Sequence, residues 1–258
     1  MLTKSGAAGL AHIRQARGAP PWQLRSVPVC SSTEQLLTHW LQTNPWSGSC
    51  PRAVTARRQI CGVGQRGRHW HSPPGGVWLS AALPWSGHGS APALLGLAVA
   101  LALAERLEGD GLNVSIKWPN DLLVNGRKLA GILPRMVHRG HRVRLARVGV
   151  GLNVVNAVPP GAIALAECGL VLPSGPRSTL LWTAELLDCL DRALLLVQQP
   201  REVCRATESR LWCGEVQDPQ NGERWSVEGL GEDGALLLRQ GTRTCRWTRW
   251  ADPENAGL

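Results

Sequence analysis

The chain has 258 residues, enough to bury a sizeable core, and its 43% hydrophobic and 18% charged residues are typical of a folded globular protein. Its longest apolar stretch, residues 91–104, is shorter than the ~20 residues that a membrane span needs, and no apolar leader opens the chain, so we expect a cytoplasmic protein without a membrane partner. The net charge of +9 would attract an anionic partner, but the positive residues are dispersed and no helix-turn-helix module fits the first thirty residues, so we expect no nucleic-acid partner.

In chain order, the first expected helix begins at Ser31, where Ser31 and Glu34 fit a capping box ahead of an apolar face. Residues 54–60 and 77–83 are typical of strands, and a Gly- and Arg-rich loop joins them. The remaining expected elements are a buried helix over residues 92–107, strands over residues 114–118, 122–124, 128–137 and 143–154, and helices over residues 178–197, capped by Ser178, and 202–211. The short turns between the strands favour an α/β (α+β) fold with a mixed, largely antiparallel sheet and packed helices.

The pattern changes near residue 213 to short strands separated by Gly-containing turns, which indicates a small β-barrel. We therefore expect three parts. They are an N-terminal extension over residues 1–25, a main domain over residues 26–212 and a small C-terminal β-barrel domain over residues 213–258.

Residues 117–133 carry the most chemical information in the chain. Asn125 and Gly126 stand between apolar runs, which predicts a two-residue hairpin whose central positions both need positive φ. The turn would bring Lys117 and Asp121 to the same site as Lys128. Two ammonium groups, one carboxylate and exposed backbone amides can stabilise a phosphate and the charge that develops on it.

The loop over residues 62–76 matches Gly-x-Gly-x-x-Gly literally at residues 62–67. A dinucleotide-binding motif needs a helix that starts within it, and the Ser-Pro-Pro-Gly-Gly run over residues 72–76 cannot be helical. We expect the loop to fold over an anionic ligand, with its backbone amides and arginines toward the anion.

No resident metal site is indicated. His69 and His71 have no third ligand nearby, so we expect them to be ordinary loop residues. The eight cysteines include no Cys-x-x-Cys pair, which favours reduced, mostly buried thiols over zinc ligands or disulfides.

Four blocks of the chain resemble, in order, the signature segments of biotin-protein ligases. They are residues 62–76 (G-V-G-Q-R-G-R-H-W-H-S-P-P-G-G), residues 117–133 (K-W-P-N-D, a hairpin, then G-R-K-L-A-G-I-L), residues 149–153 (G-V-G-L-N) and residues 234–238 of the small barrel. The chain looks like the short form of the family, without an N-terminal DNA-binding domain, so repressor activity is not implied. The family's fold would give a class II synthetase-like catalytic domain and an SH3-like barrel.

This resemblance implies a reaction. An enzyme of this kind forms biotinyl-5'-AMP from biotin and ATP, releases pyrophosphate, and transfers biotin to a lysine of a biotin carboxyl carrier protein, a subunit of acetyl-CoA carboxylase. ATP with Mg²⁺ and biotin would be its substrates. A monomer and a homodimer both stay open.

The resemblance also implies roles for individual residues. Lys128 matches the catalytic lysine and would stabilise the charge on the α-phosphoryl group. Asp121 would orient Mg²⁺ or the acceptor amine, or it would only cap the turn, and both readings stay open. The implied biotin contacts are Ser32, Thr33, Gln59, Gly62, Val63, Gly64, Gln65, Trp70, Lys128, Gly131 and Gly151. The implied nucleotide contacts are Arg66, Arg68, Lys117, Asn120 and Asn153.

Three positions depart from the family pattern. Val63 and Gln65 stand where the pattern has arginines, and Glu34 stands where it usually has asparagine. Losing a preorganised donor commonly costs about two to three orders of magnitude in rate. A slower enzyme, or one that releases its reactive adenylate, is therefore a hypothesis that labelling of bystander proteins can test.

Two alternatives stay open at this point. A lipoate or octanoate transferase of similar fold would need a long, narrow acyl tunnel, and competition between biotin and lipoate would separate it. A catalytically weak biotin-binding protein would bind biotin without releasing pyrophosphate from ATP.

Overall fold

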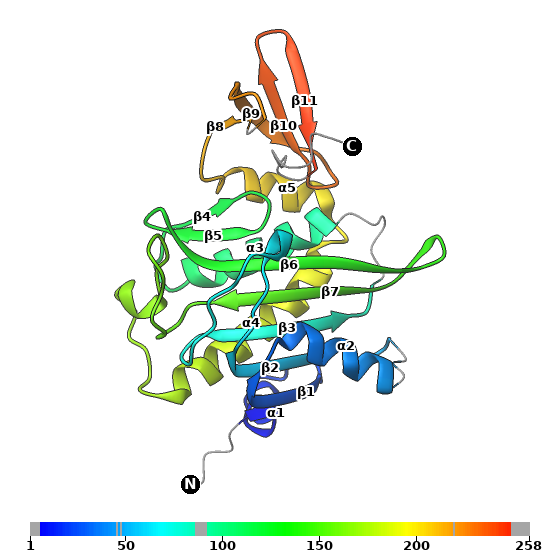
Figure 1. Ribbon diagram of the computed structural model, residues 1–258, viewed down its shortest axis with the longest axis vertical. Helices are drawn as coiled ribbons and strands as arrows, with labels where there is room; N and C mark the ends of the chain where they lie inside the picture. The colour runs from blue at the N-terminus through cyan, green and yellow to red at the C-terminus, as the bar shows by residue number, and fades with distance from the viewer. Residues whose placement is uncertain (1–5, 45, 47, 86–91, 219, 249–258) are drawn as a thin grey trace.

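The computed structural model describes residues 6–44, 46, 48–85, 92–218 and 220–248. A seven-stranded sheet of order β1-β2-β3-β7-β6-β5-β4 occupies the centre of the larger part of the chain (Figure 1). Its strands are β1 (Gln23–Cys30), β2 (Arg52–Gln59), β3 (Val77–Leu83), β4 (Val114–Lys117), β5 (Asp121–Val124), β6 (Arg127–Arg139) and β7 (Arg142–Leu152). β1 and β2 run parallel and every other neighbouring pair is antiparallel, so the predicted mixed, largely antiparallel sheet is confirmed.

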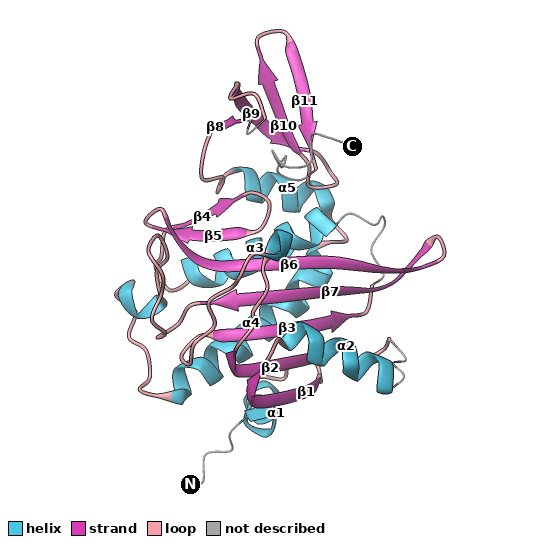
Figure 2. Ribbon diagram, viewed as in Figure 1, coloured by secondary structure: helices cyan, strands magenta, loops and turns pink. Residues whose placement is uncertain are grey.

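Helices pack on both faces of this sheet (Figure 2). They are α1 (Gly6–Ala16), α2 (Thr33–Thr43), α3 (Pro92–Glu108), α4 (Pro176–Leu196) and α5 (Pro200–Glu208). Successive side chains of a strand point to opposite faces. On β3, Leu79 and Ala81 join the core formed by α3 and α4, whereas Ala82 packs with Leu37 and Trp40 of α2. The α2 face is therefore opposite the face that α3 and α4 cover.

The predicted buried helix is confirmed as α3, in which every residue from Leu94 to Ala104 is buried. Such all-round burial is typical of a central helix of a core. Among the described residues, no helix has both the length and the hydropathy to cross a bilayer.

Two elements, α1 and β1, were missed by the sequence analysis. β1 is an edge strand that contains Pro28, and proline within a sheet is confined to such positions because it donates no ladder hydrogen bond. α1 packs against α4, where the nearly buried Arg14 pairs with Asp188 and Asp191. α1 and the start of β1 fall within the range expected to be an extension, of which residues 1–5 lie outside the described residues.

Several predicted element boundaries were wrong. The residue that caps α2 is Ser32, not Ser31, and its hydroxyl accepts a hydrogen bond from the Glu34 amide. Ser178 does not cap α4, because Gly175 precedes the helix and Pro176 starts it with a preset φ. A proline likewise starts α5, which runs from Pro200 to Glu208 rather than over residues 202–211.

The C-terminal part forms a second, four-stranded antiparallel sheet of order β11-β10-β9-β8. Its strands are β8 (Glu215–Gln217), β9 (Arg224–Leu230), β10 (Leu236–Gln240) and β11 (Arg243–Trp247), and residues 249–258 lie outside the described residues. The indole of Trp118 donates a buried hydrogen bond of 2.8 Å to the Gly234 carbonyl. Gly234 has a φ of +82°, and a Cβ there would lie 2.9 Å from the Leu94 amide nitrogen, so only glycine permits this contact.

Candidate functional site

A cavity of about 1560 Å³ lies over the α2 face of the large sheet and extends to the C-terminal sheet. Its wall comes from the start of α2, the glycine loop (residues 62–76), the strands β4 to β7 and residues 211–217. The predicted site residues that line it are Ser32, Thr33, Gln59, Val63, Gly64, Gln65, Arg66, Arg68, Trp70, Lys117, Asn120, Asp121, Lys128, Gly131, Gly151 and Asn153. Elements far apart in the sequence thus converge on one cavity.

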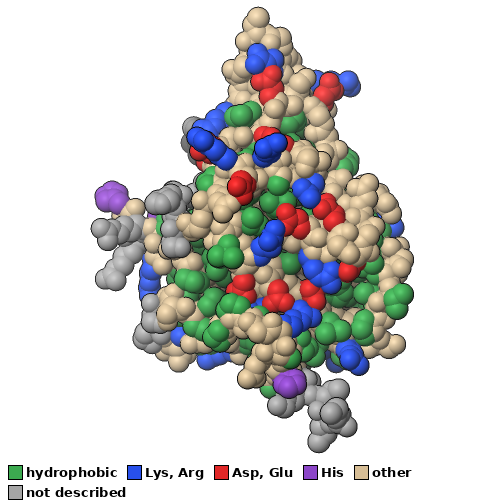
Figure 3. Space-filling view, turned by 180° about the vertical axis from the view of Figure 1, so that it is seen from behind, with side chains coloured by type: hydrophobic (Ala, Val, Ile, Leu, Met, Phe, Trp, Pro, Cys, Tyr) green, Lys and Arg blue, Asp and Glu red, His purple; other side chains and the backbone are tan. Residues whose placement is uncertain are grey.

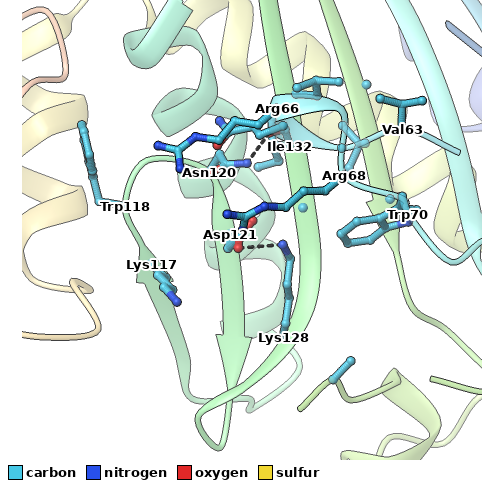
Figure 4. A pocket seen from close by; sticks show the side chains of 18 of the residues that line it. Val63, Arg66, Arg68, Trp70, Lys117, Trp118, Asn120, Asp121, Lys128 and Ile132 are labelled. Atoms are coloured by element: carbon cyan, nitrogen blue, oxygen red, sulfur yellow. Dashed lines mark hydrogen bonds and ion pairs between the residues drawn. The ribbon is translucent and has the colours of Figure 1, made fainter. Parts of the chain in front are cut away.

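The predicted hairpin is confirmed between β5 and β6. Asn125 and Gly126 have φ of 52° and 69°, as a two-residue turn of this type requires. The Lys128 Nζ lies 2.6 Å from Asp121 Oδ2 (Figure 4). The other carboxylate oxygen, Asp121 Oδ1, is buried and has no hydrogen-bond partner. This carboxylate therefore keeps an unsatisfied acceptor in the cavity wall, and such a group calls for an explanation in a native structure.

Lys117 lies one strand away from Asp121 rather than on the same arm of the hairpin. A further turn over residues 118–120 separates β4 from β5, and Lys117 faces Asp121 across these two strands. The Lys117 Nζ lies 5.4 Å from the ring centroid of Trp212, which lines the cavity from the C-terminal side. We call Lys117, Asp121 and Lys128 the ionic end of the cavity.

The glycine loop folds as a tight hairpin and starts no long helix, as predicted. Val63 and His69 form an antiparallel bridge, and the Gly64 amide donates to the Arg68 carbonyl at 2.8 Å. At its tip Arg66 has a φ of 59°, which few residues other than glycine adopt. Arg68 reaches from the loop toward Asp121, and Arg66 reaches toward the neighbouring Asn120 (Figure 4). The loop thus carries guanidinium groups to the ionic end.

The indole of Trp70 lies directly over two glycines of the sheet. A Cβ at Gly151 would stand 2.4 Å from Trp70 Nε1, and one at Gly131 would stand 2.9 Å from the same ring. The Lys128 Nζ lies 4.9 Å from the ring centroid. The Nε1 atom is buried without a hydrogen-bond partner. These glycines, expected to admit a ligand, first of all make room for the indole.

At the opposite end of the cavity the side chains are polar and mostly neutral. Gln59 Oε1 accepts hydrogen bonds from the Thr33 amide at 2.8 Å and the Thr33 hydroxyl at 3.0 Å. Gln59 Nε2 donates to Ser72 at 2.9 Å, and Thr33 Oγ1 shares a hydrogen bond of 2.8 Å with Ser80 Oγ. We call Ser32, Thr33, Gln59 and Ser80 the polar end. Its side chains are fixed by one another, as a preorganised recognition site requires.

Three predicted site residues have additional or different contacts. Gly62 is not part of the cavity wall, and a Cβ there would lie 2.6 Å from the Trp70 carbonyl oxygen and from Ser72 Oγ. Asn120 Nδ2 donates to the Ile132 carbonyl at 2.8 Å. The Asn153 side chain accepts a 3.0 Å hydrogen bond from Asn156. The two asparagine side chains therefore also brace the cavity wall.

Ser80 and Trp212 are two of the cavity-wall residues that the sequence analysis did not predict. Ser80 is the one polar residue of β3, whose sequence is Val-Trp-Leu-Ser-Ala-Ala-Leu, and a lone buried hydroxyl in an apolar strand was the available signal. Trp212 is 47% exposed although most tryptophans bury their rings. Its place at the junction of the two sheets depends on long-range packing that no local pattern reveals.

The thiols and the metal-ligating residues offer no second site. Within the described part of the chain, no cluster of three or more His, Cys, Asp or Glu side chains could hold a metal ion, and all eight cysteines are free. Burial raises the pKa of the Cys189 thiol to about 12 and that of Cys204 to about 11, so both stay protonated at neutral pH.

Comparison with known proteins identifies relatives of the chain. Residues 26–153 match the family described as "Biotin/lipoate A/B protein ligase family". The chain is 34% identical over 201 residues to a biotin--[acetyl-CoA-carboxylase] ligase of Paracoccus denitrificans, an alignment that covers 72% of this chain and 83% of that protein. It is 35% identical over 183 residues to the bifunctional ligase/repressor BirA of Escherichia coli, covering 67% of this chain and 54% of that protein.

The fold also matches solved structures. A biotin protein ligase from Aquifex aeolicus, solved in complex with biotin and ATP, superposes with a TM-score of 0.67 at 26% sequence identity. The match covers 88% of this chain and 96% of that one.

Proposed function

The chain belongs to the biotin protein ligase family, and from this membership we propose which side chains perform ATP-dependent biotin ligation. In the first step a carboxylate oxygen of biotin attacks the α-phosphorus of ATP, and the bond to pyrophosphate breaks. In the second step the amine nitrogen of an acceptor lysine attacks the acyl carbon, loses a proton, and the bond to AMP breaks. Biotin and ATP must therefore bind side by side in one continuous cavity.

The order of the strands supports one orientation for biotin. The polar end belongs to α2, β2 and β3, the glycines under Trp70 belong to β7 and β6, and the ionic end belongs to β6, β5 and β4. Neighbouring strands are ~4.8 Å apart, so β3 and β5 are separated by about 14 Å. A ring at the polar end, with its acyl chain running over the glycines, would present its carboxylate to Lys128.

The Lys128–Asp121 pair carries the proposal. A carboxylate that approaches a phosphate meets electrostatic repulsion, and a fixed ammonium group offsets it most where charge develops. Lys128 lies between Asp121 at 2.6 Å and the face of Trp70, and it lines the cavity. We assign Lys128 to the charge on the α-phosphoryl group in both steps.

Asp121 has the oxygen that the second step needs. Its Oδ1 is buried without a partner while Oδ2 is held by Lys128. An acceptor ammonium must lose a proton before its nitrogen can attack, and a carboxylate within hydrogen-bond reach can receive it. In the first step the same oxygen could face the Mg²⁺ that accompanies ATP, since a single carboxylate with substrate phosphates is a usual magnesium environment.

The nucleotide contacts are assigned to the cations of the loop and of β4. Arg66 and Arg68 approach the ionic end from the glycine loop, and Lys117 approaches it from the other side. Guanidinium and ammonium groups on two sides of a polyphosphate neutralise it and hold it in line with the attacking carboxylate. Asn120 and Asn153, both in the cavity wall, complete the proposed nucleotide set.

The partners and the domain roles follow from the same reaction. The proposed acceptor is a biotin carboxyl carrier protein, and the proposed compartment is the cytoplasm, where ATP is available and eight free thiols stay reduced. Residues 26–212 would catalyse the reaction, and residues 213–258 would close the cavity beside Trp212. Biotin rather than lipoate is the substrate favoured by the named relatives.

The test is biotin-dependent exchange of labelled pyrophosphate into ATP. Wild-type protein should catalyse it, and Lys128→Ala should lower the rate by about 10²–10³-fold. Arg127→Ala is the matched control, because this neighbouring cation is exposed, pairs with Glu167 at 3.1 Å and does not line the cavity. Biotin binding without exchange would refute the proposed catalysis, and exchange that survives Lys128→Ala would refute the role of this lysine.

A further inference from the structure

Glu34 is an acidic residue in the wall of a cavity that should bind two anionic substrates. It follows Ser32 and Thr33 in the first turn of α2 and therefore lies beside the polar end. Lys128, on β6, lies at the other end of the cavity. A carboxylate in that position needs a cation that compensates for its lost hydration. Its presence beside a ligand site also needs a functional explanation.

The partner is Arg147 of β7. One guanidinium nitrogen of Arg147 lies 3.0 Å from Glu34 Oε1, and the same nitrogen donates to the Glu34 carbonyl at 3.0 Å and to Thr38 Oγ1 at 2.7 Å. These contacts fix Arg147 against the first turns of α2. The pair as a whole is neutral, so it places an acceptor in the cavity without adding net negative charge.

Arg147 engages one carboxylate oxygen of Glu34, Oε1, and the second oxygen, Oε2, remains for a ligand. Glu34 Oε2 has no hydrogen-bond partner among the described residues, and the side chain is 23% exposed. The neutral groups next to it are already engaged: Gln59 Oε1 accepts two hydrogen bonds from Thr33, and the Ser32 hydroxyl accepts one from the Glu34 amide. The Glu34 carboxylate is thus the charged acceptor beside the polar end.

We propose that Glu34, held by Arg147, is a specificity-determining contact that accepts a hydrogen bond from a ring N–H of biotin. The inference rests on the proposed function, because it requires the ureido ring at the polar end. That ring has two N–H donors, whereas a lipoyl or octanoyl group has none and would leave the carboxylate facing an apolar ligand. Glu34 can therefore favour biotin by accepting a hydrogen bond from it. It can disfavour an apolar acyl group, because that group would remove water from the carboxylate without replacing the lost hydrogen bonds.

The test is a calorimetric comparison of biotin with two derivatives, each methylated on a different ring nitrogen. A hydrogen bond to a charged acceptor corresponds to about 10- to 150-fold in affinity. Glu34→Ala should weaken biotin binding by that factor and Glu34→Gln by less. For the derivative whose methyl group removes the donor facing Glu34, wild type and Glu34→Ala should bind within about twofold of each other. Glu105→Gln, which removes a half-buried, ion-paired acid on α3 outside the cavity wall, is the matched control and should not change biotin binding.

The outcomes separate the two claims. A loss in Glu34→Ala that is equal for biotin and for both derivatives would show a structural role and overturn the inference, as would undiminished biotin binding. Failure of the wild-type protein to bind biotin at all would overturn the proposed function and the inference with it. The melting temperatures of Glu34→Ala and Glu34→Gln, measured alongside, exclude unfolding as the cause of a loss when both lie well above the temperature of the binding experiment.

Discussion

The charges on the helical face of the molecule and the charges around the cavity follow opposite rules. On the helical face, basic and acidic side chains lie next to one another (Figure 3). Ion pairs join α1 and α3 to α4, and a further pair joins α3 to Arg210, which follows α5. At the ionic end two lysines accompany one carboxylate, with Arg68 reaching toward it. Within the described residues, Arg68 and Lys117 form no ion pair.

The difference separates the charges that stabilise the fold from the charges that bind a ligand. A buried arginine is tolerated only when carboxylates compensate for its lost hydration. Cations in excess in an open cavity keep their hydration until an anion replaces the water. We therefore expect substitutions on the helical face to change the free energy of unfolding, and substitutions around the cavity to change the kinetics.

The largest effect should come from Arg14→Ala on the helical face. Arg14 is 3% exposed, pairs with Asp188 and Asp191, and donates to the Pro20 carbonyl at 2.9 Å. Removing one partner of a buried ion pair costs about 3–5 kcal/mol. Because Asp188 and Asp191 are partly exposed and keep Arg17 and Trp22 as partners, we expect a loss toward the lower end of this range. Urea denaturation should show this loss, while the exchange rate per folded molecule stays at the wild-type value. A loss below about 1 kcal/mol would contradict the contrast between the two regions.

The next effect concerns the floor of the cavity and has its control on the same strand. Gly151→Ala would bring a Cβ to 2.4 Å from Trp70 Nε1, whereas Gly149→Ala would meet nothing closer than Leu133 Cβ at 3.6 Å. Overpacking costs about 1–3 kcal/mol. If the indole can only be accommodated at that cost, biotin binding should weaken in Gly151→Ala by roughly five- to 150-fold, since about 1.4 kcal/mol corresponds to tenfold. Gly149→Ala should leave biotin binding nearly unchanged. Equal effects of the two substitutions would argue against the indole as part of the binding wall.

The sequence predicts those parts of the site that depend on residues close together in the chain. The Asn125-Gly126 turn requires only its own backbone, so the hairpin and the pairing of Asp121 with Lys128 were both predictable. The packing of Trp70 on Gly151 joins a loop to a strand eighty residues away, and no spacing rule connects them. The sequence could identify the glycines but not the ring that requires them.

The same distinction explains the errors in the fold. β1 was missed because Pro28 and its exposed side chains interrupt the alternation that marks a strand, and only its parallel pairing with β2 makes it one. The cap of α2 was misplaced by one residue because Ser31 and Ser32 are equally good caps by composition. What decides between them is that the Ser31 carbonyl accepts a hydrogen bond from Cys61, a contact between distant segments.

A smaller effect is expected at the glycine loop, where the family pattern has two more arginines. Val63 and Gln65 leave the glycine loop with less positive charge than the family pattern has, and both line the cavity. If the adenylate is held loosely, bystander proteins should acquire biotin when incubated with enzyme, biotin and ATP. Gln65→Arg should reduce this labelling about tenfold, which corresponds to about 1.4 kcal/mol, close to the lower end of the range for one hydrogen bond to a charged group. Absence of bystander labelling by the wild-type protein would refute loose retention.

The smallest effect should come from an exposed pair on the helical face. Arg192 lies 2.6 Å from Glu105, but its side chain is 56% exposed, and water competes for both charges. Exposed pairs contribute about 0.2–1 kcal/mol, and salt screens them. Arg192→Ala should therefore lower the free energy of unfolding by less than 1 kcal/mol, with the difference shrinking in 1 M salt. Exchange activity should not change, because Arg192 does not line the cavity. A kinetic defect in this variant would mean that the helical face influences the cavity, and that charge balance alone does not separate the two regions.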